Sequence, residues 1–225
     1  MFKSLLNNLK DDAFYIRNFL PHPEKYLSWK DVYQCFKNNY VHWEILDPSP
    51  SRHRIPIPTK RYEYFRHPIQ DQKMVRQFIE QGLGFVMLEY SYSKKNVNNL
   101  CKEIQKHFLV TTDVHVFGGM SAQSHSLNLH CDLATNLVIP TYGKTKFTVY
   151  DNRLSTLHDL DKIQEEKPWL DDPSLLDVKF EVVLEAGDLL YLPARVYHQA
   201  IPLEKRLSMS IPCWGINDRS QQVPR

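Results

Sequence analysis

From Asp113 onward the chain is a succession of short runs rich in β-branched and aromatic residues, each closed by turn residues. Many short strands at regular spacing are typical of a β-barrel or of a double-sheet jelly roll. This texture constrains the fold more than any other feature of the chain. It predicts strands at residues 114–117, 127–132, 136–141, 145–150, 178–184, 189–192, 197–201 and 206–212.

The first 70 residues lack this texture and favour helices. Apolar residues between 11 and 20 indicate a first helix, and a second is predicted over residues 25–40. Residues 47–61 then combine basic side chains with four prolines. No helix crosses prolines at that density, so this segment is predicted to be an extended arm on the surface.

Two further helices and a strand precede the β-rich part. Asp71 is a good N-cap for a helix whose apolar positions recur until Gly82. Residues 85–90 read as a buried strand, and residues 97–108 as an amphipathic helix. We therefore predict a helical region with a basic arm, residues 1–70, packed on a catalytic jelly-roll domain, residues 71–225.

Composition excludes several classes of protein. A net charge of +2 gives no support for direct nucleic-acid binding. The four cysteines are scattered without a CxxC pair, which argues against a zinc cluster and a disulfide framework. The N-terminus is a poor signal peptide, and no apolar run approaches the length of a membrane span. We expect a cytoplasmic protein with free thiols and no membrane partner.

Three residues in the β-rich part match a metal site. In a strand, residues two apart point to the same side, so His130 and Asp132 are expected to point together while Cys131 points away. His198 is expected to come from a neighbouring strand. Two imidazoles and one carboxylate are the ligands of a non-haem Fe(II) oxygenase site, which leaves the other metal positions open.

The His-x-Asp triplet means little by itself. With ten histidines and fifteen aspartates in 225 residues, chance alone predicts about 0.7 such triplets. The context of His198 adds the weight, because a turn at residues 185–188 leads into an apolar strand, a proline turn and then the histidine.

Both segments resemble one family. Gly187 to Pro193, followed by His198 and Gln199, resembles the distal-histidine segment of the JmjC and cupin-like 2-oxoglutarate oxygenases. Residues 130–132, Asn136 and the run from Gly143 to Tyr150 resemble the first metal-binding strand of that family and its return strand. The resemblance covers residues 71–214 and is nearest to the ribosomal-oxygenase cupins.

The resemblance implies a fold and an activity. The fold would be a double-stranded β-helix, and His130, Asp132 and His198 would hold Fe(II). The enzyme would use 2-oxoglutarate and O2 to hydroxylate a C–H bond on a peptide, a protein or an amino-acid side chain, and a homodimer is possible. Two alternatives stay open: a cupin isomerase or dioxygenase that does not use 2-oxoglutarate, and a binding module without catalysis.

The chain departs from the family at the far carboxylate of 2-oxoglutarate. The family usually places a Lys or Arg two residues after the turn glycine, where this chain has Thr145. Three anchors are considered: Arg206 with Ser208 on the same strand face, Lys146, or a pocket of hydroxyls that includes Thr145. Asn136 matches an asparagine near the cosubstrate in relatives of the family. The role of the acidic, helix-leaning insert at residues 154–173 is left open.

Overall fold

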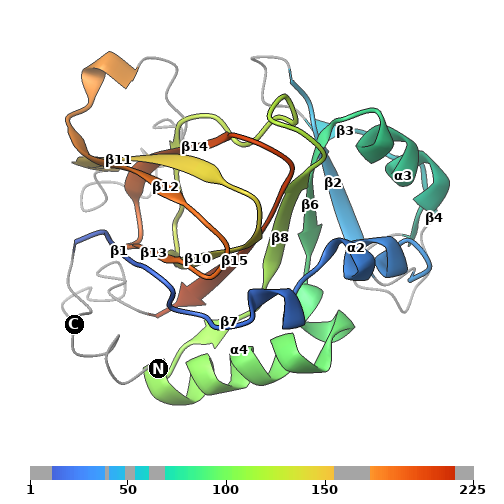
Figure 1. Cartoon of the computed structure of the whole chain (residues 1–225), viewed down its shortest axis with the longest axis horizontal. Helices are drawn as coiled ribbons and strands as arrows, with labels where there is room; N and C mark the ends of the chain where they lie inside the picture. The colour runs from blue at the N-terminus through green and yellow to red at the C-terminus, as the bar shows by residue number, and fades with distance from the viewer. Residues whose placement is uncertain (1–11, 39–40, 49–53, 61–68, 155–172, 216–225) are drawn as a thin grey trace, which may run out of the picture.

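The computed structural model describes residues 12–38, 41–48, 54–60, 69–154 and 173–215. Eight strands in the C-terminal part form two antiparallel sheets, in the orders β13-β10-β15-β8 and β12-β11-β14-β9 (Figure 1). Apart from the β11–β12 hairpin, consecutive strands alternate between the two sheets, so the predicted double-stranded β-helix is confirmed. Their bounds are β8 His115–Gly119, β9 His130–Cys131, β10 Thr135–Tyr142, β11 Thr145–Arg153, β12 Val178–Leu184, β13 Leu189–Leu192, β14 Val196–Pro202 and β15 Arg206–Trp214.

Strands from outside the jelly roll widen the first sheet. β1 (Phe14–Ile16) pairs with β13 at one edge. At the other edge, β6 (Gly84–Leu88), β2 (His42–Leu46) and β3 (Arg54–Ile55) follow β8 in order. β7 (Thr111–Thr112) also pairs with β15, and β4 (Thr59–Lys60) pairs with β5 (Ile69–Gln70) in a separate ribbon.

The first predicted helix, over residues 11–20, is wrong. The Phe14 ring stacks on Tyr191 of β13 with ring centres 4.8 Å apart, while Tyr15 points outward and is 43% exposed. Pairing with the edge of β13 outweighs the local helical pattern, because it satisfies the backbone and buries Phe14 at once.

The helices are shorter than predicted in the N-terminal region and close to prediction after it. α2 (Trp29–Cys35) begins at a capping box formed by Ser28 and Asp31. α3 (Gln72–Glu80) begins at Asp71, whose carboxylate accepts two backbone N–H groups, as predicted. The remaining helices are α4 (Lys95–Phe108) and the 3-10 turns η1 (Pro23–Lys25), η2 (Tyr90–Ser93) and η3 (Pro173–Leu175).

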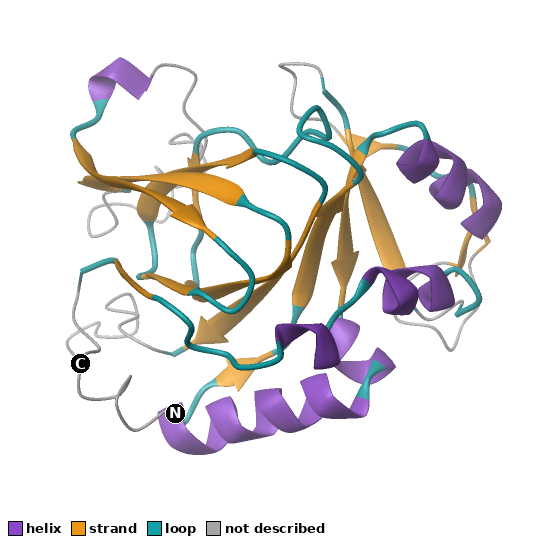
Figure 2. Cartoon of the chain, in the orientation of Figure 1, coloured by secondary structure: helices purple, strands orange, loops and turns teal. Residues whose placement is uncertain are grey.

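The helices pack against the outer face of the wide sheet (Figure 2). One hydrophobic cluster joins Val32, Ile79 and Ile104 of the three α-helices to Trp43 and Met209 of the strands. β2, from before residue 70, is hydrogen-bonded to β6, from after it, so one sheet contains strands from both predicted regions. The boundary at residue 70 stays a prediction. None of the helices in the described residues is long and apolar enough to cross a membrane.

The two faces of β15 differ sharply in polarity. Leu207, Met209 and Ile211 are fully buried in the cluster beneath the helices. The alternate residues, Arg206, Ser208 and Ser210, line a cavity inside the jelly roll. Because side chains alternate along a strand, this polar stripe is directed away from the helices and toward the interior. Residues 155–172 of the predicted insert lie outside the described residues. So do residues 49–53 and 61 of the predicted arm.

Candidate metal centre and adjoining pocket

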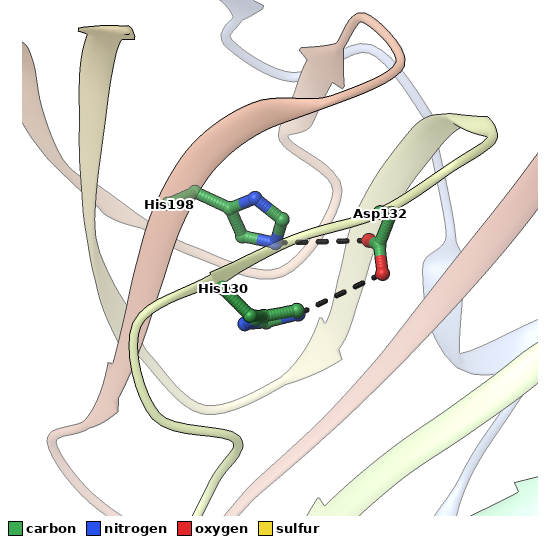
Figure 3. A group of neighbouring side chains, drawn as sticks. All are labelled: His130, Asp132 and His198. Carbon is green, nitrogen blue, oxygen red and sulfur yellow. Dashed lines mark ion pairs between the residues drawn. The ribbon is translucent and has the colours of Figure 1, made fainter. Parts of the chain in front are cut away.

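His130, Asp132 and His198 converge on one point inside the jelly roll (Figure 3). One ligand atom from each residue lies within 4.8 Å of the others. His130 Nε2 is 3.7 Å from Asp132 Oδ1, and His198 Nε2 is 3.7 Å from Asp132 Oδ2. The two histidines are cross-strand partners on β9 and β14, while Asp132 follows the last residue of β9.

Both imidazoles direct Nε2 to this point. His130 Nδ1 lies 2.7 Å from the carbonyl oxygen of Asn128, and His198 Nδ1 lies 3.0 Å from that of Val196. A carbonyl oxygen only accepts, so each Nδ1 carries the proton and each Nε2 is the unprotonated nitrogen. Burial, reinforced by the neighbouring His198, holds the pKa of His130 below its ordinary value.

A hydrogen-bonded pair from two other strands supports the carboxylate. Asn136 Nδ2 of β10 donates to Asp132 Oδ2 at 2.7 Å. Ser210 Oγ of β15 donates to Asn136 Oδ1 at 3.2 Å. Asn136 is therefore part of the site, although the structure places it against the carboxylate and not among the residues that line the cavity.

The turn before β14 ties His198 to the first ligand strand. The N–H of Arg195 donates to the carbonyl oxygen of Asp132 at 2.6 Å, and the N–H of Ala194 donates to Thr135 Oγ1 at 3.2 Å. Arg195 has φ +69°, an uncommon conformation for a residue other than glycine. Through these hydrogen bonds the turn links the strand that carries His198 to the segment that carries Asp132.

The donor set fits a divalent transition metal such as Fe(II). Two neutral imidazole nitrogens and one carboxylate match the facial ligand set of non-haem iron sites. Each imidazole is also oriented by a backbone carbonyl, the usual support of a metal-binding histidine. The burial of Cys131 in a separate hydrophobic cluster confirms that it points away from the site, as predicted.

A cavity that is partly open to solvent adjoins the metal cluster. The exposed area of its walls is mainly apolar, and apart from the metal cluster and Ser126 its polar groups come from β15. The lining residues are Phe117, Ser126, Leu127, His130, Asp132, Val138, Phe147, His198, Ala200, Arg206, Ser208 and Ser210.

Arg206 is a buried cation without a counter-ion among the described residues. The residue is 2% exposed, and its Nε and Nη2 have no hydrogen-bond partner there. Burial alone lowers the pKa of Arg206, to about 10. The hydroxyls of Thr145 and Ser208 are likewise buried and unpartnered. An uncompensated buried charge is costly, so this end of the cavity is suited to an anion.

A glycine turn packs the β10–β11 connection against the backbone just before β15, whereas Thr145 is not among the residues that line the cavity. Gly143 has φ +72°, and a Cβ there would lie 2.0 Å from the carbonyl oxygen of Lys205. Only glycine allows this approach of the β10–β11 turn to the backbone before Arg206. The turn glycine in the sequence thus has a packing role next to the buried cation.

The structure does not bring Lys146 to the pocket. Its Nζ lies 2.8 Å from Glu181 Oε1 on β12, and its side chain is 35% exposed. Thr145 and Phe147, on either side of it in β11, are buried. Of the predicted cations, only Arg206 reaches the cavity.

Sequence reasoning missed Ser210 and the apolar walls of the cavity. Ser210 lies two residues beyond Ser208 on the same strand face, so extending the alternation from Arg206 would have found it. No comparable signal marks Phe117 or Phe147, because aromatic residues in strands are usually part of a core.

Comparisons with known proteins agree with this geometry. The model of the JmjC domain family matches residues 88–220, more than half of the chain. The bifunctional lysine-specific demethylase and histidyl-hydroxylase NO66 of Dictyostelium discoideum is 26% identical over 130 residues, which cover 57% of this chain and 24% of that protein.

Solved structures show the same fold. The Escherichia coli ribosomal oxygenase YcfD with cobalt and succinic acid has a TM-score of 0.63 at 12% identity, covering 97% of this chain and 52% of that one. The same protein with cobalt and 2-oxoglutarate has a TM-score of 0.63 at 13% identity, covering 98% and 53%. The chain thus spans only part of the length of these relatives. By the family model and the fold, the chain belongs to the JmjC domain family.

Proposed function

We propose that the chain is an Fe(II)- and 2-oxoglutarate-dependent oxygenase that hydroxylates a C–H bond of a peptide, a protein or an amino-acid side chain. The observation that carries the proposal is the pairing of two features in one cavity. The cluster of His130, Asp132 and His198 forms one part of the cavity wall. Arg206 forms another part, and its Nε and Nη2 have no hydrogen-bond partner among the described residues. A metal site beside a buried cation suits a ligand with a chelating end and a carboxylate end.

In this proposal the three clustered side chains hold Fe(II). When bound, the iron would supply the oxidation, in which 2-oxoglutarate, O2 and the substrate C–H are converted to succinate, CO2 and the hydroxylated product. The side chains keep their ligand atoms in place through the backbone carbonyls behind both imidazoles and through Asn136 behind the carboxylate.

Arg206 is assigned to the far carboxylate of 2-oxoglutarate. A guanidinium matches a carboxylate with two parallel N–H donors, and its Nε and Nη2 are the two nitrogens without partners. The hydroxyl of Ser208, on the same face of β15, is a further donor, and Thr145 is a third. This pairing would offset the cost of burying the cation.

The apolar walls exclude water from the space between the two ends. Val138 and Phe147 are 7% and 6% exposed and line the cavity from β10 and β11. Charge interactions strengthen when water is excluded, so the same walls favour the pairing of Arg206 with an anion.

The substrate is expected to approach from the side of Asp132. The Asp132 side chain is 39% exposed, against 7% for His130 and 6% for His198. The relatives named above are a histidyl-hydroxylase and a ribosomal oxygenase, which supports a peptide or protein substrate for this chain.

A direct test is incubation with Fe(II), 2-oxoglutarate and O2 in the presence of candidate peptides and proteins. The expected result is succinate formation and the gain of one oxygen atom by one substrate, measured by mass spectrometry. His130→Ala should abolish both signals. A surface variant, Lys146→Ala, should retain them, because Lys146 faces Glu181 outside the cavity. Turnover of a substrate without use of 2-oxoglutarate would contradict the proposal and favour another cupin reaction.

A further inference from the structure

A buried hydrogen-bonded chain from Ser210 through Asn136 ends on the carboxylate of Asp132. Ser210 Oγ lies 3.2 Å from Asn136 Oδ1, and Asn136 Nδ2 lies 2.7 Å from Asp132 Oδ2. Ser210 is 9% exposed and Asn136 is 4% exposed. The chain therefore connects β15 and β10 of the large sheet to the end of the first ligand strand.

Every donor in this chain points toward Asp132. An ionised carboxylate only accepts hydrogen bonds, so the amide nitrogen of Asn136 faces it. The amide oxygen then faces Ser210, whose hydroxyl donates to it. This arrangement is the one in which all three groups are satisfied, so the amide cannot flip without leaving a buried group unpaired.

The hydrogen bonds from Ser210 through Asn136 engage one oxygen of the Asp132 carboxylate and leave the other available. Asn136 binds Oδ2 of Asp132, whereas Oδ1 accepts no hydrogen bond from the described part of the chain. Oδ1 is the oxygen that lies 3.7 Å from His130 Nε2. Its lone pairs therefore remain available to a metal held by the cluster.

We infer that Asn136 and Ser210 are positioning residues that fix the Asp132 carboxylate so that it offers Oδ1 to the metal. The inference rests on the proposed function insofar as it assumes a metal in this cluster. It goes beyond that function by assigning the rigidity of the ligand set to two residues on the opposite sheet. Neither residue touches the metal.

Asp132 needs such support because, among the described residues, no second hydrogen-bond donor fixes its side chain. It lies beyond the end of β9, and its side chain is 39% exposed, so neither cross-strand packing nor burial selects a rotamer. Both histidines, in contrast, are almost fully buried and bonded to backbone carbonyls. The carboxylate is thus the ligand most able to rotate into water.

The sheet itself does not depend on this chain. β10 and β15 are paired in register from Thr135 with Cys213 to Pro140 with Ser208, so backbone hydrogen bonds already hold the two strands together. Removal of the Ser210 hydroxyl should leave this pairing intact. The effect of such a variant should therefore fall on the metal site and not on folding.

The test is the affinity of the metal-free protein for Co(II), measured anaerobically by titration calorimetry without 2-oxoglutarate. Asn136→Ala should raise the Kd for Co(II) by about 10–100-fold, and Ser210→Ala by about 10-fold, which is the usual effect of losing an outer hydrogen bond to a ligand. Ser210→Thr keeps the hydroxyl and should restore an affinity near that of the wild type. The double alanine variant should be no weaker than Asn136→Ala, because both changes break one chain.

Ser208→Ala is the matched control for metal binding. Ser208 is on the same strand face, two residues away, but within the described part of the chain its hydroxyl is hydrogen-bonded neither to Asn136 nor to Asp132. Its Kd for Co(II) should stay within about twofold of the wild type. Thermal unfolding of each metal-free variant checks that the fold is retained.

Three outcomes would overturn the inference, and they are distinguishable. If folded Asn136→Ala and Ser210→Ala bind Co(II) as tightly as the wild type while His130→Ala does not bind, the positioning role is refuted and the metal site stands. If the wild type binds Co(II) no better than His130→Ala, the proposed function fails together with the inference. A loss caused equally by Ser208→Ala would also refute the specific role of the chain.

Discussion

His130 and His198 are directly opposed on the antiparallel strands β9 and β14, and their ring centres lie 4.3 Å apart. Each ring is bonded through Nδ1 to the carbonyl oxygen two residues before it. The pairing register of two short strands thus sets both imidazoles in equivalent positions. A slip of either strand by one residue would turn its histidine to the opposite face, so the strand register is itself a determinant of the site.

The first prediction concerns acid. Burial lowers the pKa of His130 in the folded state, whereas in the unfolded chain it stays near 6.5. The unfolded state therefore binds more protons below that pH, and the stability from neutral, buried His130 is present above pH 6.5 and lost as the pH falls. The free energy of unfolding of the metal-free protein should drop between about pH 6.5 and 5, measured by urea denaturation.

The control for this prediction is a histidine on the surface. His130→Asn should flatten the dependence on pH, whereas His22→Asn should not, since His22 is largely exposed. Asparagine also suits the left-handed conformation of residue 22. An unchanged slope in His130→Asn would show that another group causes the acid effect.

The second prediction concerns the cosubstrate anchor. Arg206→Ala should raise the 2-oxoglutarate concentration needed for half-maximal activity by about 100-fold, about 2.7 kcal/mol, because a charge-assisted pair is lost. Thr145→Lys introduced into Arg206→Ala should recover part of this loss, because it restores a cation two residues after the turn glycine, where the family usually has one. Succinate formation measures both effects.

Lys146→Ala is the matched control for the anchor. Its partner is Glu181 on the outer side of β11, so the requirement for 2-oxoglutarate should not change. If Lys146→Ala weakened 2-oxoglutarate binding as much as Arg206→Ala does, the assignment of the anchor would be wrong.

A third prediction separates stability from function at the same residue. A buried cation without a counter-ion lowers stability, so Arg206→Met should raise the free energy of unfolding of the ligand-free protein by about 1–3 kcal/mol. The same variant should lose the stabilisation that 2-oxoglutarate gives to the metal-loaded wild type. Denaturation with and without 2-oxoglutarate measures both. Destabilisation by Arg206→Met would indicate that the arginine supports the fold.

The fourth prediction concerns the thiols. Burial raises the pKa of Cys35 to about 11 and the pKa values of Cys101, Cys131 and Cys213 to about 12. The folded protein should therefore react slowly with a disulfide reagent at pH 8, while in urea all four cysteines should react. Fast reaction of one thiol in the folded protein would show that its segment opens readily.

The same thiols give an alkaline limit. Their pKa values are higher in the folded state than in the unfolded state, so the stability from burying neutral thiols is complete below about pH 8.5. It should decline as the pH rises toward 11 and 12, because the unfolded chain releases these protons first. Urea denaturation at pH 8 and pH 10 checks the sign.

The jelly roll and the metal cluster were predictable because both depend on local patterns. Alternation places His130 and Asp132 together, and the glycine and proline turns bound the strands that deliver His198. The sequence left open which of Arg206 and Lys146 lines the cavity, because this depends on how their strands are arranged in the folded jelly roll. β1 was missed for a related reason: its strand conformation comes from pairing with β13, far along the chain.

The central claim is best tested by anaerobic titration of the metal-free protein with Fe(II) and 2-oxoglutarate, followed by visible absorption. When Fe(II) and 2-oxoglutarate bind together at the cluster, a weak visible charge-transfer band should appear. Addition of O2 should then make this band disappear as succinate is formed. His130→Ala should give neither signal. A wild-type protein that binds Fe(II) but shows no band and forms no succinate would contradict the account.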